Sequence, residues 1–389
     1  MDPLAHTLVG AALGRTRLGH GVPYATVTLA LAANAPDVDA LVYFAGEDAG
    51  FHWRRGWSHG PIGLVVLPVV LVLAVTVWSR WRRRDGGGPL PVGRLTALAY
   101  LGALTHPALD WLNTYGIRLL SPFSRRWYYG DTLFIVDPWL WLTLGGALFL
   151  AHSATVRGVA GWAALGLAAS FLVLGGPAPL VAKALWIAGL AALALARVSA
   201  RDGCRQRGAA IVTVAAAAAG VYVVAMLLSA VYARGYVLAE LSRRGVGPVE
   251  ALMVGPVPAT PFRREVVAQT SDGYRFGVLR FDPAPRLDLI EGERGFRPKP
   301  AADPLTRAAL ADPTIRGFAG WARFPYVETE LLQDGRAQVW VLDARYLQGP
   351  PGGGRSFGAA RVFVPALPGT ALGIVAERAA GGSSDGAPP

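Results

Sequence analysis

Long apolar runs separated by short polar segments dominate the first 235 residues of the chain. Roughly 20 apolar residues cross the hydrocarbon core of a bilayer as a helix. Uncharged runs that reach or approach this length lie at 61–79, 95–109, 138–156, 158–182, 184–196 and 208–233. No run of this kind follows residue 235. The pattern therefore predicts a polytopic helical membrane domain that precedes an extramembrane region.

Two shorter apolar stretches, at 3–14 and 22–35, precede the first long run. Each is too short to cross a bilayer as a straight helix. The basic segment 15–21 between them is typical of a turn. We expect a helical hairpin whose open ends carry three residues with ligand-type side chains, namely His6, Asp37 and Asp39.

The pattern after residue 235 favours strands. Alternating segments joined by Asp-Gly turns predict two antiparallel hairpins, at 265–281 and 326–342. A further strand is predicted at 360–365, and a helix at 303–311. The fold class is thus mainly α, with a polytopic helical membrane domain followed by a small antiparallel β-rich extramembrane domain.

These patterns divide the chain into four segments. Residues 1–150 hold the hairpin and about three further spans, and they contain the candidate metal site. Residues 151–235 add further transmembrane helices, and residues 236–378 form the β-rich domain. We expect residues 379–389, which are rich in Gly, Ser, Ala and Pro, to be a disordered tail.

The net charge of +11 belongs mainly to the membrane half, where residues 1–235 hold 19 Lys and Arg against 10 Asp and Glu. Many of these cations lie in two loops, at 80–94 and 197–207, which the positive-inside rule assigns to the cytoplasm. We therefore expect a multi-pass protein of the inner (plasma) membrane with an extracytoplasmic C-terminal domain, although three arginines at 118–126 weaken this orientation. We expect the lipid bilayer as the partner of this half of the chain. Its basic charge is explained by the loops and does not call for a nucleic-acid partner.

His106 and Asp110 stand inside an otherwise apolar run, where ionisable side chains are costly unless they face a protein interior or a wet cavity. Their i, i+4 spacing puts both side chains on one face of a helix, one turn apart. Such a pair can bind a metal ion, or it can be a buried hydrogen bond. Pro107 removes a backbone donor and predicts a kink or a new helix start at this point.

Other ligand-type side chains gather in the first 60 residues. Asp37 and Asp39 are separated by one residue, which suits either a helix cap or a metal site. His59 opens an apolar run, while His52 lies in an aromatic and basic loop that also suits a membrane interface. A lone histidine such as His6 is more often a hydrogen-bonded core residue than a ligand. The expected topology places all five on the outer side.

The donor types point to a divalent metal ion as cofactor. Imidazole nitrogens and carboxylates without thiolates suit zinc, and also manganese or iron. A bound divalent ion lowers the pKa of a coordinated water toward neutrality and polarises a phosphoryl or carbonyl oxygen. Zinc is the first candidate, and one or two ions could be bound.

Several motifs occur in order within residues 1–150: Met1–Gly10, Ala33–Asp39, Arg55–His59, His106–Asp110 with Asn113–Gly116, and Leu120–Ser124. Together they resemble the YdjM family of inner-membrane, metal-dependent hydrolases. The resemblance implies helical membrane proteins whose histidines and aspartates are similar to those of zinc-dependent phospholipase C-like enzymes.

Carried over motif by motif, the resemblance implies a set of metal ligands made of His6, Asp39, His59, His106 and Asp110. It implies catalytic roles for Asp37 and His52. The chain departs from the family pattern in two places. The family more often has His-Arg-Gly before the second histidine, which affects His52, and an aliphatic residue where Pro107 stands.

We expect a membrane-bound metal-dependent hydrolase that acts on a phosphoester or other ester of a lipid or envelope substrate. Arg125 and Arg126 are candidates for binding the substrate, although contact with anionic headgroups is a simpler explanation. The C-terminal region has no histidine and no Gly-x-Ser-x-Gly motif, which favours a lid, docking or substrate-guiding role. The alternative is a non-enzymatic transporter, in which His106 and Asp110 relay protons, or a scaffold.

Overall fold

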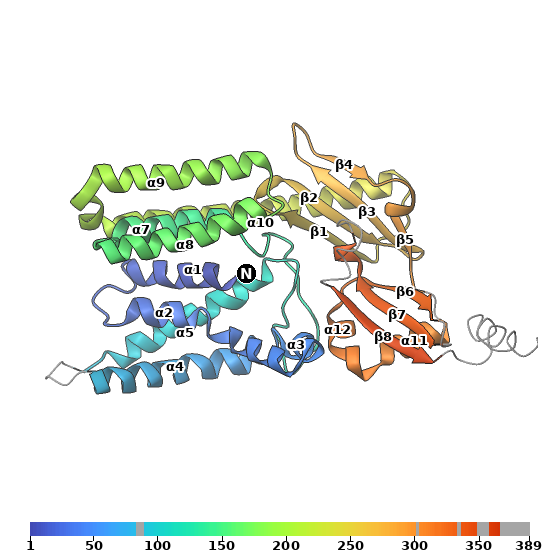
Figure 1. Cartoon of the computed structure of the whole chain (residues 1–389), viewed down its shortest axis with the longest axis horizontal. Helices are drawn as coiled ribbons and strands as arrows, with labels where there is room; N and C mark the ends of the chain where they lie inside the picture. Colours follow the sequence, from blue (N-terminus) through green and yellow to red (C-terminus); the bar gives the residue numbers. More distant parts are fainter. Residues whose placement is uncertain (83–88, 301–302, 333–335, 348–357, 366–389) are drawn as a thin grey trace, which may run out of the picture.

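The computed structural model describes residues 1–82, 89–300, 303–332, 336–347 and 358–365. The molecule is elongated, with a helical bundle at one end and a β-rich domain at the other (Figure 1). The predicted fold class, mainly α with a C-terminal antiparallel region, is confirmed.

The bundle begins with a helical hairpin and two long helices. Its elements are α1 (Pro3–Arg15), α2 (Ala25–Ala32), the 3-10 helix η1 (Ala35–Ala45), α3 (Glu47–Trp53), α4 (Pro61–Arg82) and α5 (Val92–Trp111). Glycines let α1 and α2 approach closely, since a Cβ at Gly10 would lie 2.4 Å from the carbonyl oxygen of Leu29. The hairpin carries its polar turn away from the β-rich domain (Figure 1).

The second part of the bundle follows a long loop. It consists of α6 (Pro138–Leu140), the π-helical stretch η2 (Trp141–Gly145), α7 (Gly146–His152), α8 (Val156–Gly175), α9 (Leu180–Gln206) and α10 (Gly208–Arg243). Within the described ranges, four helices are long and apolar enough to cross a membrane, namely α4, α8, α9 as far as Ser199, and α10. The bent pair of α2 and η1 adds a fifth if it is one broken span.

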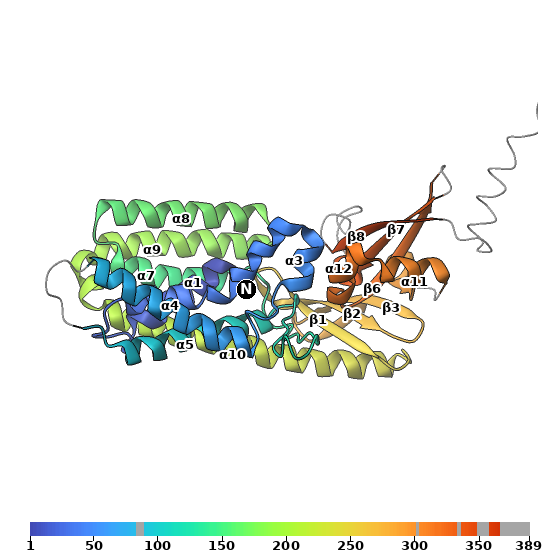
Figure 2. The ribbon, with the colours of Figure 1, turned by 90° about the horizontal axis from the view of Figure 1, so that it is seen from below.

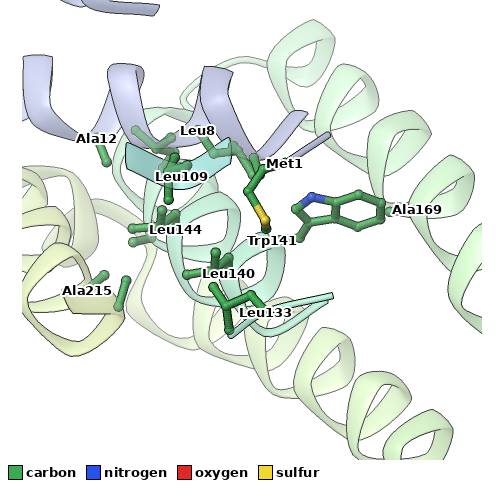
Figure 3. Close-up of a cluster of buried hydrophobic side chains, with 14 of the residues drawn as sticks. Met1, Leu8, Ala12, Leu109, Leu133, Leu140, Trp141, Leu144, Ala169 and Ala215 are labelled. Atoms are coloured by element: carbon green, nitrogen blue, oxygen red, sulfur yellow. The ribbon is translucent and has the colours of Figure 1, made fainter. Parts of the chain in front are cut away.

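Buried apolar side chains from both parts of the bundle meet in one core. Figure 3 shows Met1 and Leu8 of the N-terminal segment against Trp141 and Leu144 of η2. Leu109 of α5 joins the same cluster. This packing fixes the start of α1 and the end of α5 relative to each other, at the end of the bundle that faces the β-rich domain.

Helix α10 extends beyond the apolar run that predicts it. It continues to Arg243, and its last turns bury Val237 and Leu241 against Leu252, Val266 and Leu279 of the first sheet. Figure 2 shows α10 running along the bundle and then beneath the strands. The expected domain boundary at residue 236 therefore falls inside this helix, which continues from one domain into the other.

The β-rich domain has two antiparallel sheets. The first contains β1 (Ala251–Val257), β2 (Thr260–Gln269), β3 (Gly273–Arg280), β4 (Arg286–Leu289) and β5 (Phe296–Pro298), in the order β1-β2-β3-β4 with β5 also paired to β3. The second contains β6 (Pro325–Leu331), β7 (Arg336–Asp343) and β8 (Ala359–Pro365).

Both predicted hairpins are confirmed, with Val267 opposite Phe276 in the first and Val327 opposite Val341 in the second. Two helices, α11 (Pro304–Ala311) and α12 (Arg316–Trp321), accompany the strands, with the short 3-10 helices η3 (Gly292–Arg294), η4 (Pro313–Ile315) and η5 (Ala344–Tyr346). The expected tail at 379–389 lies outside the described residues.

Helix α5 continues through Pro107 to Trp111, so of the two expected outcomes, a kink or a new helix start, the new start is wrong. The preceding turn packs tightly on α2, because a Cβ at Gly102 would lie 2.9 Å from both Ala32 Cβ and the Leu29 carbonyl oxygen. Pro107 itself is buried. Tertiary packing thus outweighs the local preference, and it keeps His106 and Asp110 on one helical face.

Candidate metal centre

Four ligand-type side chains converge at the end of the bundle that faces the β-rich domain. Asp37 comes from η1, His59 from the loop before α4, and His106 and Asp110 from successive turns of α5. One ligand atom from each residue lies within 4.8 Å of the other three. We call these residues the four-ligand group. The i, i+4 pair supplies half of it, as helical geometry requires.

The spacing of the four atoms fits one small cation. His59 Nε2 lies 3.0 Å from His106 Nε2 and 3.4 Å from Asp110 Oδ2, and Asp37 Oδ1 lies 3.7 Å from each imidazole nitrogen. A tetrahedral ion with bonds of roughly 2.0–2.2 Å needs ligand atoms about 3.3–3.6 Å apart. The four residues can therefore hold a zinc-like ion with little movement.

The hydrogen bonds behind the two imidazoles also fit a metal. His106 Nδ1 lies 2.6 Å from the carbonyl oxygen of Ala33, which can only accept a hydrogen bond. His59 Nδ1 lies 3.1 Å from Asp39 Oδ2. Both Nδ1 atoms are thus assigned as donors, which leaves the lone pairs of both Nε2 atoms facing each other. A cation between them removes this repulsion.

Asp39 stands behind His59 and does not belong to the four-ligand group. Its Oδ2 accepts hydrogen bonds from the Arg55 backbone N–H (2.8 Å) and the Ser58 hydroxyl (2.8 Å), and its Oδ1 contacts Arg54. The sequence assigns Asp39 to the metal and Asp37 to catalysis. The structure brings Asp37 to the other ligands and places Asp39 where it orients an imidazole.

Arg55 is a buried cation that the sequence does not single out. Its Nη2 donates to Asp110 Oδ1 (3.0 Å) and its Nη1 to Asn113 Oδ1 (3.0 Å) and the Gly116 carbonyl (2.8 Å). The residue is 3% exposed and has a left-handed φ of 50°. In the sequence, the several carboxylates expected near one another could have pointed to such a residue, since buried carboxylates require compensating charge.

His6 touches the four-ligand group from the side of α1. Its Nε2 lies 3.3 Å from Asp110 Oδ1, and its ring stacks on His106 with centroids 3.9 Å apart. The Met1 amino nitrogen also contacts Asp110 Oδ1. His6 therefore approaches Asp110 Oδ1, which also accepts a hydrogen bond from Arg55 Nη2. The other oxygen of this carboxylate, Oδ2, faces His59 and His106.

His52, Arg125 and Arg126 do not join the four-ligand group in the described part of the chain. His52 lies on α3, where its carbonyl accepts from Arg118 (2.7 Å), and burial with the charges of Arg118 and Arg125 lowers its pKa. Arg125 and Arg126 are exposed in the loop after α5, and Arg126 stacks over Tyr128.

His59 is completely buried next to two carboxylates. Burial alone would lower its pKa, but hydrogen bonds and charges from Asp110 and Asp39 outweigh this effect and raise the pKa above 6.5. The surroundings of the His59 imidazole therefore favour positive charge. A proton and a divalent cation compete for the same position.

Comparison with known proteins bears on this half of the chain. Residues 1–179 match the YdjM inner membrane protein family. The resemblance seen in the motifs is thereby confirmed, and the matched region contains the whole four-ligand group. No curated protein and no solved structure matches the chain. The match and the apolar helices together show a multi-pass membrane protein.

The β-rich domain lies beyond the YdjM-matched region. It contacts the loop after α5, which lies next to the polar site of that region. Arg345 Nη1 donates to the Thr114 carbonyl (2.6 Å), and Trp321 Nε1 donates to the Tyr115 carbonyl (3.2 Å). The Tyr115 ring in turn lies under the Arg55 guanidinium at 4.5 Å. A continuous series of contacts, through Trp321, Tyr115 and Arg55, therefore connects the C-terminal domain with Asp110.

Proposed function

We propose that this protein is a membrane-bound hydrolase that depends on a divalent metal ion, with zinc as the first candidate. Asp37, His59, His106 and Asp110 would hold the ion. The observation that carries the proposal is the facing pair of imidazole Nε2 atoms, 3.0 Å apart with two carboxylates beside them. This donor set of two nitrogens and two oxygens suits zinc and leaves hydrolytic chemistry as its most direct use.

A divalent ion in such a site lowers the pKa of a bound water and polarises a phosphoryl or carbonyl oxygen. The protein's own residues would prepare the site for this. Asp39 and the Ala33 carbonyl orient the two imidazoles, so that each presents Nε2. Arg55 holds Asp110 in place, with Nη2 donating to Oδ1 and Nε 2.9 Å from Oδ2, the oxygen that also faces the imidazoles.

The open side of the site supports an anionic ester as substrate. The Asp37 side chain is 17% exposed and Arg54 is 16% exposed, whereas the other three ligands are at most 1% exposed. Arg54 donates to Asp37 Oδ1 at 2.8 Å. Its guanidinium would stabilise negative charge on a phosphoryl or acyl oxygen that enters there. We propose a phosphoester or other ester of a lipid or envelope precursor.

The sidedness of the protein belongs to the same proposal. The β-rich domain and the four-ligand group lie at the same end of the bundle (Figure 1). The end of α4, the start of α5 and the junction of α9 and α10 lie at the other end (Figure 1). The basic segments 80–94 and 197–207 belong to these places in the chain, and the positive-inside rule assigns them to the cytoplasm. We therefore propose an extracytoplasmic site, with Arg125 and Arg126 next to anionic headgroups or substrate.

Metal analysis of the purified full-length protein tests the proposal directly. We expect about one zinc, manganese or iron per chain after equilibration with each metal. His59→Ala and Asp110→Ala should lose it, while His152→Ala should retain it, because His152 bonds only to the Leu148 carbonyl among the described residues. Absence of bound metal in the wild type, or equal content in all variants, would refute the site.

Hydrolysis is tested separately with a panel of lipid phosphoesters and carboxylic esters. The metal-loaded wild type and His152→Ala should release product, and His59→Ala should not. A wild type that binds metal but cleaves no member of the panel would contradict hydrolysis and favour a transporter or scaffold with a structural metal.

A further inference from the structure

A cavity of about 440 Å³ lies within the bundle, between α1, η2, α7, α8 and α9. Its walls include Leu8, Trp141, Trp162, Gly166, Trp186 and Leu190. The volume falls in the range of small-molecule sites, roughly 300–1,000 Å³. Gly166 lines the cavity, and a Cβ at this position would meet no other atom within 4 Å, so there is room for a larger side chain.

Three polar groups around this cavity already have hydrogen-bond partners within the chain. Trp186 Nε1 donates to Ser170 Oγ (3.0 Å), and Ser170 Oγ donates to the Gly166 carbonyl (2.7 Å). Trp141 Nε1 donates to Asp2 Oδ1 (3.1 Å). A water molecule needs two to four polar partners, so an apolar cavity of this kind stays dry or takes an apolar ligand.

The position of the cavity identifies that ligand. Helices α8 and α9 are both candidate membrane spans, and they carry exposed apolar side chains away from the cavity, such as Phe171 (80%) on α8 and Leu195 (68%) on α9. The surroundings at this depth are therefore lipid. Hydrocarbon chains of bilayer lipids are the apolar ligands available there.

Helix α1 separates the cavity from the four-ligand group. Leu4 and Leu8 line the cavity, while His6 between them contacts Asp110 and His106 on the other side. Met1 lies next to Trp141 in the core (Figure 3), as part of one buried cluster. Its amino nitrogen touches Asp110. The first turns of α1 therefore lie between the cavity and the polar site.

We infer that the cavity binds one hydrocarbon chain of a membrane lipid, and that this lipid is the class of substrate whose polar end reaches the four-ligand group around the start of α1. The second half of this inference rests on the proposed hydrolase function. The first half, lipid-chain binding, does not.

Two matched substitutions on α8 separate the cavity from the membrane around it. Gly166→Leu places a side chain in the cavity. Gly161→Leu places the same side chain on an exposed part of the same helix, where a Cβ also meets nothing within 4 Å and which does not line the cavity. Both changes raise helix propensity, so neither should unfold α8.

The full-length protein is reconstituted in phosphatidylglycerol nanodiscs with a trace of phosphatidylglycerol that carries a photoreactive diazirine on one acyl chain. We expect labelling of the buried residues Leu8 and Trp141 in the wild type and Gly161→Leu, read out by peptide mass spectrometry. Gly166→Leu should lower this labelling at least about tenfold, since each displaced methylene weakens binding. Absent labelling of Leu8 and Trp141, or equal labelling in all three proteins, would overturn the inference.

Metal content and hydrolysis separate the two halves. All three proteins should hold equal metal. Gly166→Leu should raise KM for long-chain esters at least about tenfold and leave short-chain esters unchanged. A wild type that is labelled at Leu8 but hydrolyses nothing refutes the hydrolase and leaves the lipid site standing. Hydrolysis with equal KM values in both variants refutes the cavity as the substrate site.

Discussion

Arg55 and Asp110 form a buried ion pair at the centre of the polar site, with Nη2 3.0 Å from Oδ1 and Nε 2.9 Å from Oδ2. Neither side chain is more than 3% exposed. The second carboxylate of the four-ligand group is paired in the same way, because Arg54 binds Asp37. Two adjacent arginines therefore neutralise the two carboxylates, which lets the site exist in the fold before any cation binds.

Arg55→Ala should destabilise the protein strongly. Removal of one partner leaves a buried carboxylate uncompensated, which typically costs about 3–5 kcal/mol. Arg55→Lys should restore part of the loss, because an ammonium cannot reach Asp110, Asn113 and the Gly116 carbonyl together. Thermal unfolding in detergent measures this. The exposed Arg126→Ala is the control, and a Tm for Arg55→Ala equal to that of this control would rule out the structural role.

Asp39→Asn should weaken metal binding without abolishing it. An amide can still contact His59 Nδ1, but it no longer enforces the tautomer or supports positive charge on the ring, and loss of such partners typically costs about 10–100-fold in metal affinity. Competition with a chelator gives the affinity. Asp48→Asn is the control, because Asp48 caps the Phe318 N–H outside the group. Complete loss of metal in Asp39→Asn would instead make Asp39 a direct ligand.

Sequence spacing predicts one half of the four-ligand group but not the other. The i, i+4 pattern places His106 and Asp110 on one face, because α-helical periodicity is fixed. The same reasoning does not resolve Asp37 and Asp39. They lie in a 3-10 helix with about three residues per turn, so residues two apart point in different directions. A 3-10 helix is hard to recognise from apolar periodicity, and so is the positive φ that turns Arg55 inward.

In the fold, too, features with a local sequence signal could be predicted, and features that depend on tertiary packing could not. Apolar runs indicate the four candidate spans α4, α8, α9 and α10 among the described residues, and Asp-Gly turns indicate both hairpins, because these signals are local. The runs at 95–109 and 138–156 became α5 and the shorter elements α6, η2 and α7, which are not among the candidate spans. The continuation of α10 to Arg243 depends on packing against β1 to β3, which no local pattern contains. The docking of Trp321 and Arg345 on the loop after α5 joins residues more than 200 positions apart, so it emerges only from the folded chain.

Trp321→Ala should loosen the contact between the β-rich domain and the polar site. Trp321 is fully buried against Phe51 and Tyr115, and truncation of a buried tryptophan typically costs about 3–5 kcal/mol. Hydrogen exchange should rise at residues 113–117 and in α3, while Trp321→Phe should have a smaller effect. Trp53→Ala, at a half-exposed position, is the control. Unchanged exchange at 113–117 would show that this contact does not hold the loop.

Glu265→Gln should stabilise the protein at neutral pH. Burial in β2 raises the pKa of the Glu265 carboxyl above 4.5, and the charge of Arg263 opposes this only in part. The folded state therefore holds this proton more tightly than the unfolded state, and the resulting stability is present below pH 4.5 and lost as the pH rises through the folded pKa. The glutamine variant escapes that loss.

Its Tm should exceed that of the wild type at pH 7, and the difference should shrink as the pH approaches 4. Glu291→Gln, at an exposed position, should show no such trend. A Glu265→Gln variant that is less stable than the wild type at pH 7 would mean that the charged carboxylate has a favourable partner, and that burial does not dominate its titration.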